Sequence, residues 1–220
     1  MMTISRKERD DQRRREDILN ASLSIFATQG FHGTTMAQIS QESQYPLGTI
    51  YKYFPSKKKI YHDLVMERVH QLGKIFFEIS IRKDLSSIEK LKKSFFAKAL
   101  FYKQNSEFIR IYISERSTID AVMMPKLNAK VNRMHEKEVA LFQTIFEEAG
   151  EDTFKNYPPG EMALLFSEIT HSVAWASLFE NSTSIGNPPS KEPSSENDVD
   201  ENPAQRVNMV FDMFINGVAK

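Results

Sequence analysis

The sequence predicts an all-α protein, and three observations support this. Apolar residues recur at intervals of three and four along nearly the whole chain, as they do on the buried face of a helix. Residues that start or end helices, such as Gly30, Pro46 and Pro55, separate these periodic stretches. The 220 residues are 40% hydrophobic and 26% charged, which is typical of a globular protein with a sizeable core.

Three helices are expected within the first 54 residues. Gly30 suits the left-handed cap after the first helix, and Pro46 suits the first turn of the third, which Pro55 ends. A seven-residue helix is not stable alone in water, so we expect Ile50 and Phe54 to pack it against its neighbours. The expected ranges are 11–29, 36–43 and 47–53.

The rest of the chain is also expected to be helical. Ser86 and Glu89 form a capping-box pattern that opens a helix. Residues 181–202 are rich in Ser, Pro, Asn and acidic residues and are predicted to form a flexible loop. We expect two domains, 12–72 and 80–220. The remaining helices are expected at about 57–79, 86–102, 106–116, 125–149, 159–180 and 203–219.

Composition excludes several classes of protein. The chain has no cysteine, so it has neither a disulfide framework nor a thiolate metal site. No apolar run approaches the roughly 18 residues that a membrane helix needs, and the N-terminus has no apolar signal core. We therefore expect a cytoplasmic protein that does not enter membranes. The sequence also indicates no cofactor and no metal site.

Charge is distributed unevenly along a chain whose formal net charge is zero. Residues 1–60 hold ten Lys and Arg against six Asp and Glu, a balance of +4 that the remainder offsets. A basic segment of this kind indicates a polyanionic partner. Within it, residues 45–59 read YPLGTIYKYFPSKKK, which gathers hydroxyl and ammonium groups around one short helix.

This arrangement predicts a helix-turn-helix over residues 35–54 that binds double-stranded DNA. With Ile50 and Phe54 packed inward, the outward side chains suit a major groove. Gly48 permits a close approach of the backbone, Thr35 begins a helix whose free N–H groups favour a phosphate, and Lys57 can reach a second phosphate. The expected outward residues of the short helix are Thr49, Tyr51, Lys52 and Tyr53.

The segments ILNASLSIFATQGFHGTTMAQIS and GTIYKYFPSKKKI resemble the DNA-binding domain of TetR/AcrR-type transcriptional regulators. The resemblance covers about residues 12–72. It implies a regulator, not an enzyme, that binds a palindromic operator as a homodimer. A small, often apolar effector would release the DNA. It also implies that Leu47 and Gly48 lie closest to the bases, and that helices at about 159–180 and 203–219 form the dimer interface.

The turn departs from the pattern of that family. Gln44 stands where glycine usually supplies a positive φ, which costs a non-glycine residue about 1 kcal/mol. Pro46 replaces the usual capping serine, and Tyr45 is larger than the usual valine. These departures affect the angle at which the recognition helix would enter the DNA groove more than the expectation that this helix forms.

An effector site is expected among the aromatic residues and methionines of the second half, although residues at this spacing are also typical of a plain core. Two other functions remain open. Residues 67–70 and 168–171 both read Glu-x-x-His, which a ferritin-like di-metal enzyme would use. The second alternative is a helical binding protein that does not bind DNA. The candidate effector residues are Phe95, Phe108, Tyr112, Met134, Phe142, His171 and Trp175.

Overall fold

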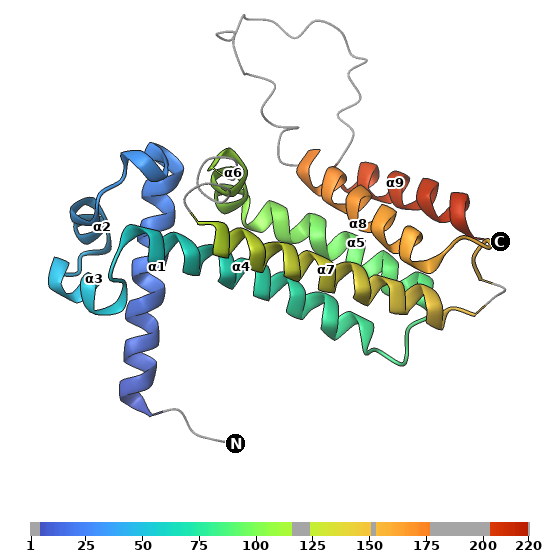
Figure 1. The fold of residues 1–220 in the computed structure, drawn as a ribbon, viewed down its shortest axis with the longest axis horizontal. Coiled ribbons are helices and arrows are strands. Elements are labelled where there is room, and N and C mark those ends of the chain that lie inside the picture. The colour runs from blue at the N-terminus through green and yellow to red at the C-terminus, as the bar shows by residue number, and fades with distance from the viewer. Residues whose placement is uncertain (1–4, 116–123, 151–152, 177–202, 220) are drawn as a thin grey trace, which may run out of the picture. The chain divides into compact units, whose positions relative to one another are not determined.

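The computed structural model describes residues 5–115, 124–150, 153–176 and 203–219 (Figure 1). Within these ranges the chain forms nine helices and no strand, which confirms the all-α prediction. The expected loop at 181–202 and the end of the helix expected at 159–180 lie outside the described residues. The helices are α1 (Arg6–Gly33), α2 (Met36–Ser43), α3 (Leu47–Tyr53), α4 (Lys57–Ser80), α5 (Ser87–Gln104), α6 (Ser106–Glu115), α7 (Pro125–Glu148), α8 (Pro159–Ala176) and α9 (Pro203–Val218).

The chain divides into two compact units. The N-terminal unit comprises Met1–His70 and Ser106–Asn132, and the C-terminal unit comprises Gln71–Asn105 and Arg133–Lys220. Helix α6 belongs to the N-terminal unit, where it packs against α1, although it lies within the range 80–220 expected for the second domain. Its buried side chains include Phe108, Ile109 and Ile111.

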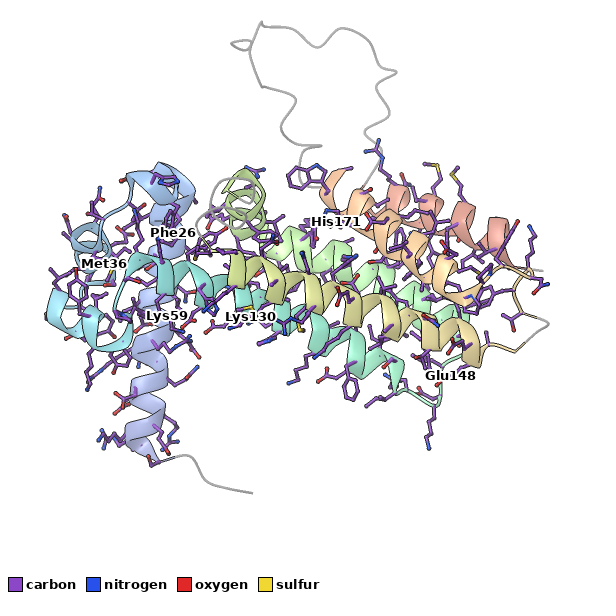
Figure 2. The ribbon with its side chains drawn as sticks, viewed as in Figure 1. Phe26, Met36, Lys59, Lys130, Glu148 and His171 are labelled. Carbon is purple, nitrogen blue, oxygen red and sulfur yellow. The ribbon has the colours of Figure 1, made fainter. Side chains whose placement is uncertain are left out.

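The core of the N-terminal unit holds the helix-turn-helix in place. Phe26, labelled in Figure 2, has its ring 5.7 Å from that of Phe31. Ile50 and Phe54 are fully buried, as predicted. Gly30 has a φ of 71°, and it kinks α1 rather than ending it, so that the helix resumes and ends at Gly33. At its other end α1 begins at Arg6, five residues earlier than predicted, because Ser5 forms a capping box.

Aromatic rings fill the core of the C-terminal unit. Helix α5 packs against α8 and α9, which also pack against each other. Phe166 is fully buried, whereas its neighbour Leu165 is 51% exposed. The buried face of α8 includes Met162, Ala163 and Phe166. The largest buried side chains of this core include Phe76, Phe95, Phe142, Phe146, Phe166, Phe211 and Phe214.

Candidate nucleic-acid interface

The first element of the site is the N-terminus of α2. Thr35 caps this helix: the backbone N–H of Gln38 donates to the Thr35 hydroxyl oxygen at 3.2 Å. In return the backbone N–H of Thr35 donates to Oε1 of Gln38 at 2.8 Å. This capping box fixes the start of α2. Thr35 is exposed, so the position at which the sequence predicts a phosphate contact lies at the surface.

The turn between α2 and α3 accommodates each of the unusual residues. Gln44 has φ 58° and ψ 20°, the left-handed conformation that its position predicted. The hydroxyl of Ser40 donates to the carbonyl oxygen of Tyr45 at 2.7 Å. The carbonyl of Pro46 accepts from the backbone N–H groups of Thr49 and Ile50 at 2.7 and 3.1 Å. As a result α3 begins at Leu47, as predicted.

One side of α3 is open to solvent. Leu47 is 39% exposed and Tyr51 is 49% exposed, while Lys52 is also exposed. A Cβ atom built on Gly48 would meet nothing within 4 Å, so the backbone is open to close approach there. Of the four side chains predicted to face outward, Tyr51 and Lys52 are exposed, whereas Thr49 and Tyr53 are half-buried.

Two tyrosines of the helix-turn-helix bind acidic residues of α1. The Tyr53 hydroxyl donates to Oδ1 of Asp11 at 2.6 Å, and the Tyr45 hydroxyl donates to Oδ2 of Asp17 at 2.9 Å. The first bond lowers the pKa of Asp11 and raises the pKa of Tyr53. The second raises the pKa of Tyr45. Sequence reasoning missed both carboxylates, because nothing in the local pattern marks residues 28 to 42 positions away as partners.

Lys57 has partners inside the protein. Its ammonium group donates to the backbone carbonyl of Thr34 at 2.5 Å and to that of His32 at 3.3 Å. It also lies 4.6 Å from the centre of the Phe31 ring. The Lys57 ammonium group thus joins the start of α4 to the end of α1. A phosphate contact at Lys57 stays a prediction.

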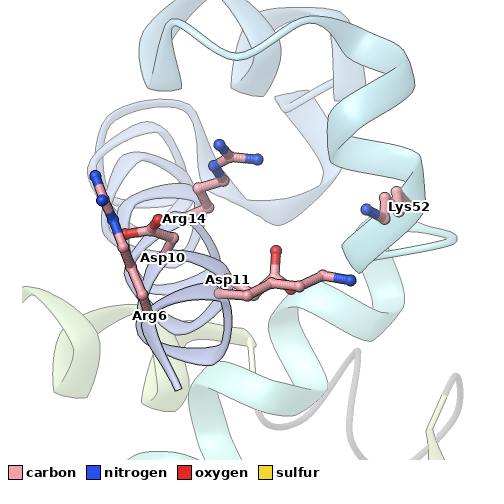
Figure 3. A pocket seen from close by; sticks show the side chains of 6 residues that line it. Arg6, Asp10, Asp11, Arg14 and Lys52 are labelled. Carbon is pink, nitrogen blue, oxygen red and sulfur yellow. The ribbon is translucent and has the colours of Figure 1, made fainter. Parts of the chain in front are cut away.

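A hollow of about 440 Å³ lies between the start of α1 and the recognition helix α3 (Figure 3). Figure 3 shows the side chains of Arg6, Asp10, Asp11 and Arg14 on α1, with Lys52 of α3 on the other side. Cations outnumber carboxylates around it, so its surface favours a phosphate-bearing partner. The lining residues are Arg6, Lys7, Asp10, Asp11, Arg14 and Lys52.

Arg15 connects α1 to α4. Its guanidinium donates to Oδ2 of Asp63 at 2.9 Å and to the carboxylate of Glu67. It also lies 5.5 Å from the centre of the buried Phe54 ring. Burial alone would raise the pKa of Asp63, but hydrogen bonds from Lys59, His62 and Arg15 hold that pKa below 3.8. Arg15 therefore stabilises the N-terminal unit by joining α1 to α4.

The candidate effector residues are divided between the two units. Phe108 and Tyr112 lie on α6 in the N-terminal unit, with their rings stacked 5.9 Å apart. The others belong to the C-terminal unit. In that unit Phe95 and Phe142 are buried in the aromatic core, while Met134, His171 and Trp175 are half-buried.

The Glu-x-x-His segments lie in different units, and their side chains have other partners. Glu67 pairs with Arg15, and the Tyr102 hydroxyl lies 2.8 Å from Nδ1 of His171. Among the described residues, no three His, Asp or Glu side chains gather in a group that could hold a metal ion. In the same part of the chain no helix combines the length and the apolar character needed to cross a membrane.

Comparison with known proteins shows what the segment around the site is similar to. Residues 18–64 match the family described as bacterial regulatory proteins, tetR family. The HTH-type transcriptional regulator YxaF of Bacillus subtilis is 41% identical over 61 residues, which is 28% of this chain and 30% of YxaF. The regulator LmrA of the same organism is 40% identical over 58 residues, which is 26% of this chain and 29% of LmrA. This chain thus spans about a third or less of these relatives.

Solved structures extend the similarity of fold to nearly the whole chain. The ketosteroid transcriptional regulator KstR2 of Mycobacterium tuberculosis has a TM-score of 0.66 at 16% identity and covers 94% of this chain and 95% of its own. AibR, solved with isovaleryl coenzyme A and operator DNA, has a TM-score of 0.64 at 14% identity. The match covers 91% of this chain and 97% of AibR. YxaF and KstR2 are both named as transcriptional regulators. The fold, the helix-turn-helix and the matched segment therefore agree in their similarity to the tetR family of bacterial regulatory proteins.

Proposed function

We propose that this protein is a ligand-responsive transcriptional repressor that binds a palindromic operator as a homodimer. The observation that carries the proposal is the geometry of α3. Its inward residues Ile50 and Phe54 are fully buried, while Tyr51 and Lys52 point to solvent on a short, well-anchored helix. Such a helix can enter a major groove without rearrangement of the unit that holds it.

The exposed chemistry of α3 suits both backbone and base contacts. Lys52 and Tyr51 can donate to phosphate oxygens, and Leu47 can contact thymine methyl groups. Because Gly48 has no side chain, the start of α3 can approach the base edges closely. Thr35, Thr49 and Lys57 flank this surface and supply further phosphate contacts.

Apolar side chains exposed on α8 and α9 support dimerisation. Leu164 and Leu165 of α8 are 45% and 51% exposed, and Met209 and Met213 of α9 are 48% and 67% exposed. Adjacent helices that present large apolar side chains to solvent are typical of a protein interface. We propose that a second copy covers them, which would pair two reading helices for two operator half-sites.

The response to a ligand is assigned to the C-terminal unit. Its aromatic interior offers the apolar lining that small-molecule sites use. AibR was solved with both an acyl coenzyme A and operator DNA, and KstR of Mycobacterium tuberculosis, 31% identical over 75 residues, is described as a repressor. These properties belong to those proteins, and they support the same type of response here.

Fluorescence anisotropy with a labelled duplex from the region upstream of the gene tests the proposal. The Tyr51→Ala/Lys52→Ala variant should bind about 100-fold more weakly, because it loses groove and phosphate contacts. The matched control, Tyr157→Ala/Lys103→Ala, removes an equally exposed tyrosine and an exposed lysine from the C-terminal unit and should bind normally. An affinity for the duplex that does not fall as the salt concentration rises, or equal affinities of the two variants, would contradict the proposal.

A further inference from the structure

Helix α5 carries a buried polar stripe through an otherwise aromatic interior. Lys90, Ser94, Lys98 and Tyr102 follow one another at four-residue intervals, so they lie along one side of the helix. All four are buried, and Ser94 and Lys98 are 0% and 3% exposed. Fully buried lysines are rare in proteins, and the burial of Lys98 was not apparent from the sequence pattern.

Lys98 lies at the centre of a small polar cluster. Its ammonium group donates to Oε1 of Glu138 on α7 at 2.7 Å. It also lies 3.4 Å from the hydroxyl of Thr170 and 3.5 Å from the carbonyl oxygen of Ser167, both on α8. The Ser167 hydroxyl donates to the same Glu138 oxygen at 2.9 Å. One positive charge is therefore held where α5, α7 and α8 meet, helices that run side by side in Figure 1.

The polar stripe extends beyond this cluster in both directions. One turn before Lys98, the hydroxyl of Ser94 is fully buried and has no hydrogen-bond partner among the described residues. One turn after it, the Tyr102 hydroxyl lies 2.8 Å from Nδ1 of His171. A buried polar atom without a partner costs free energy, so the Ser94 hydroxyl can gain a hydrogen bond from a polar group that enters the interior.

Stability alone does not account for a buried ion pair at this position. Removing two charges from water costs several kcal/mol for each ion, and apolar residues of similar volume are often as stabilising or more so. The core around the cluster is well suited to apolar residues, since the rings of Phe142 and Phe166 lie 4.8 Å apart and that of Phe95 lies 6.0 Å from Phe166. The retained charge therefore favours a role in binding.

We propose that Lys98 is the anion-binding residue of the effector site and that the effector is a carboxylate with an apolar body. This inference rests on the proposed ligand response and assigns the ligand a chemical class. The carboxylate binds the Lys98 ammonium and accepts a hydrogen bond from Ser94. Its apolar body enters among Phe95, Phe142 and Phe166, which lie within four positions of Lys98, Glu138 and Ser167 along α5, α7 and α8.

Glu138 occupies the position of the carboxylate while no ligand is bound. The Glu138 side chain is 14% exposed and that of Lys98 is 4% exposed, so the glutamate can turn towards solvent and the lysine stays inside. An incoming carboxylate then replaces one carboxylate with another, which leaves the buried charge balanced. This exchange separates α7 from the contact that joins it to α5 and α8.

Isothermal titration calorimetry on the full chain tests the inference, with hexanoate, octanoate and decanoate as probes and the alcohols of equal length as controls. The carboxylates should bind and the alcohols should bind at least ~10-fold more weakly. Lys98→Met should lower carboxylate affinity ~10- to 100-fold, whereas Glu138→Gln should raise it several-fold, because the internal competitor loses its charge. A purely structural ion pair would not give these opposite changes.

Lys90→Met is the matched control, since Lys90 lies on the same stripe and pairs with Glu148 at 3.2 Å; it should leave carboxylate affinity unchanged. If Lys98→Met does not fold, Lys98→Met/Glu138→Leu removes both charges and should fold without binding carboxylates. Equal binding of acids and alcohols, no binding of any acid, or unchanged affinity in the Lys98 variants would overturn the inference. DNA binding measured in parallel separates this failure from failure of the proposed function.

Discussion

The hydroxyl of Tyr53 donates a 2.6 Å hydrogen bond to Oδ1 of Asp11, so the last residue of α3 is tied to α1 across 42 positions of sequence. A tyrosine that donates to a carboxylate cannot donate the same proton to a phosphate. In the free protein Tyr53 therefore positions α3, whereas Tyr51 and Lys52 are exposed to solvent and are the residues that we propose contact DNA.

We expect Tyr53→Phe and Asp11→Asn to lower stability non-additively. Tyr53→Phe removes the hydrogen bond and Asp11→Asn removes the charge that strengthens it, so the double variant should lose less stability than the sum of the two single losses. Urea unfolding of the four proteins measures this. Asp10→Asn, a neighbouring change on the exposed start of α1, should act additively with Tyr53→Phe. Additive losses for the Tyr53 and Asp11 pair would show that the bond contributes nothing.

The left-handed backbone at Gln44 predicts a stabilising substitution. A φ of 58° costs a residue with a side chain about 1 to 2 kcal/mol, and glycine avoids most of this cost. Gln44→Gly should raise the free energy of unfolding by about 0.5 kcal/mol, after the larger entropy of glycine in the unfolded chain is counted. Gln41→Gly, within α2, should lower it by about 1 kcal/mol. Destabilisation by both changes would contradict the strain at Gln44.

The network around Asp63 predicts a loss of stability in acid. Its pKa in the folded protein lies below the ordinary 3.8, so its contribution is fully present above that pH and is lost as the pH falls further. Asp63→Asn should cost about 2 kcal/mol at pH 7 by urea unfolding, and the difference from the unchanged protein should shrink towards pH 3. A difference that is the same at both pH values would count against the network.

Asp84 provides the comparison for this experiment. Its pKa is about 2 because Arg82 donates hydrogen bonds to it, but both side chains are exposed. Solvent screens such pairs, so Asp84→Asn should cost much less than Asp63→Asn.

The proposed dimer interface predicts a change in oligomeric state. Leu165→Lys/Met213→Lys places charges on two residues that the partner would bury, so light scattering should show a monomer with weakened DNA binding. Phe77→Lys/Leu100→Lys is the matched control, because these side chains are 56% and 54% exposed on other helices. A dimer that survives the first pair of changes, or is lost with the second, would refute the assigned interface.

Short-range signals explain what the sequence predicted well. The bounds of α2 and α3 and the positive φ of Gln44 depend on neighbours within a few residues, such as Thr35 and Pro46, and the structure confirms them. The buried anchors Ile50 and Phe54 follow from the same periodicity.

Contacts between distant segments explain the rest. The placement of α6 in the N-terminal unit, the exposure of Leu165 and the bond from Tyr53 to Asp11 depend on how helices pack, which periodicity does not determine. The burial of Lys98 could not be predicted from the sequence, because a lysine between apolar residues on a helix is usually at the surface. Its burial follows from partners 40 and 72 positions away.

Selection from a random pool of double-stranded DNA tests the central claim most directly. If the exposed face of α3 reads a major groove, the purified protein should enrich an inverted repeat whose half-sites are related by the symmetry of a dimer. The Tyr51→Ala/Lys52→Ala variant should enrich nothing. A pool that stays random with the unchanged protein, or the same repeat recovered by that variant, would contradict the account.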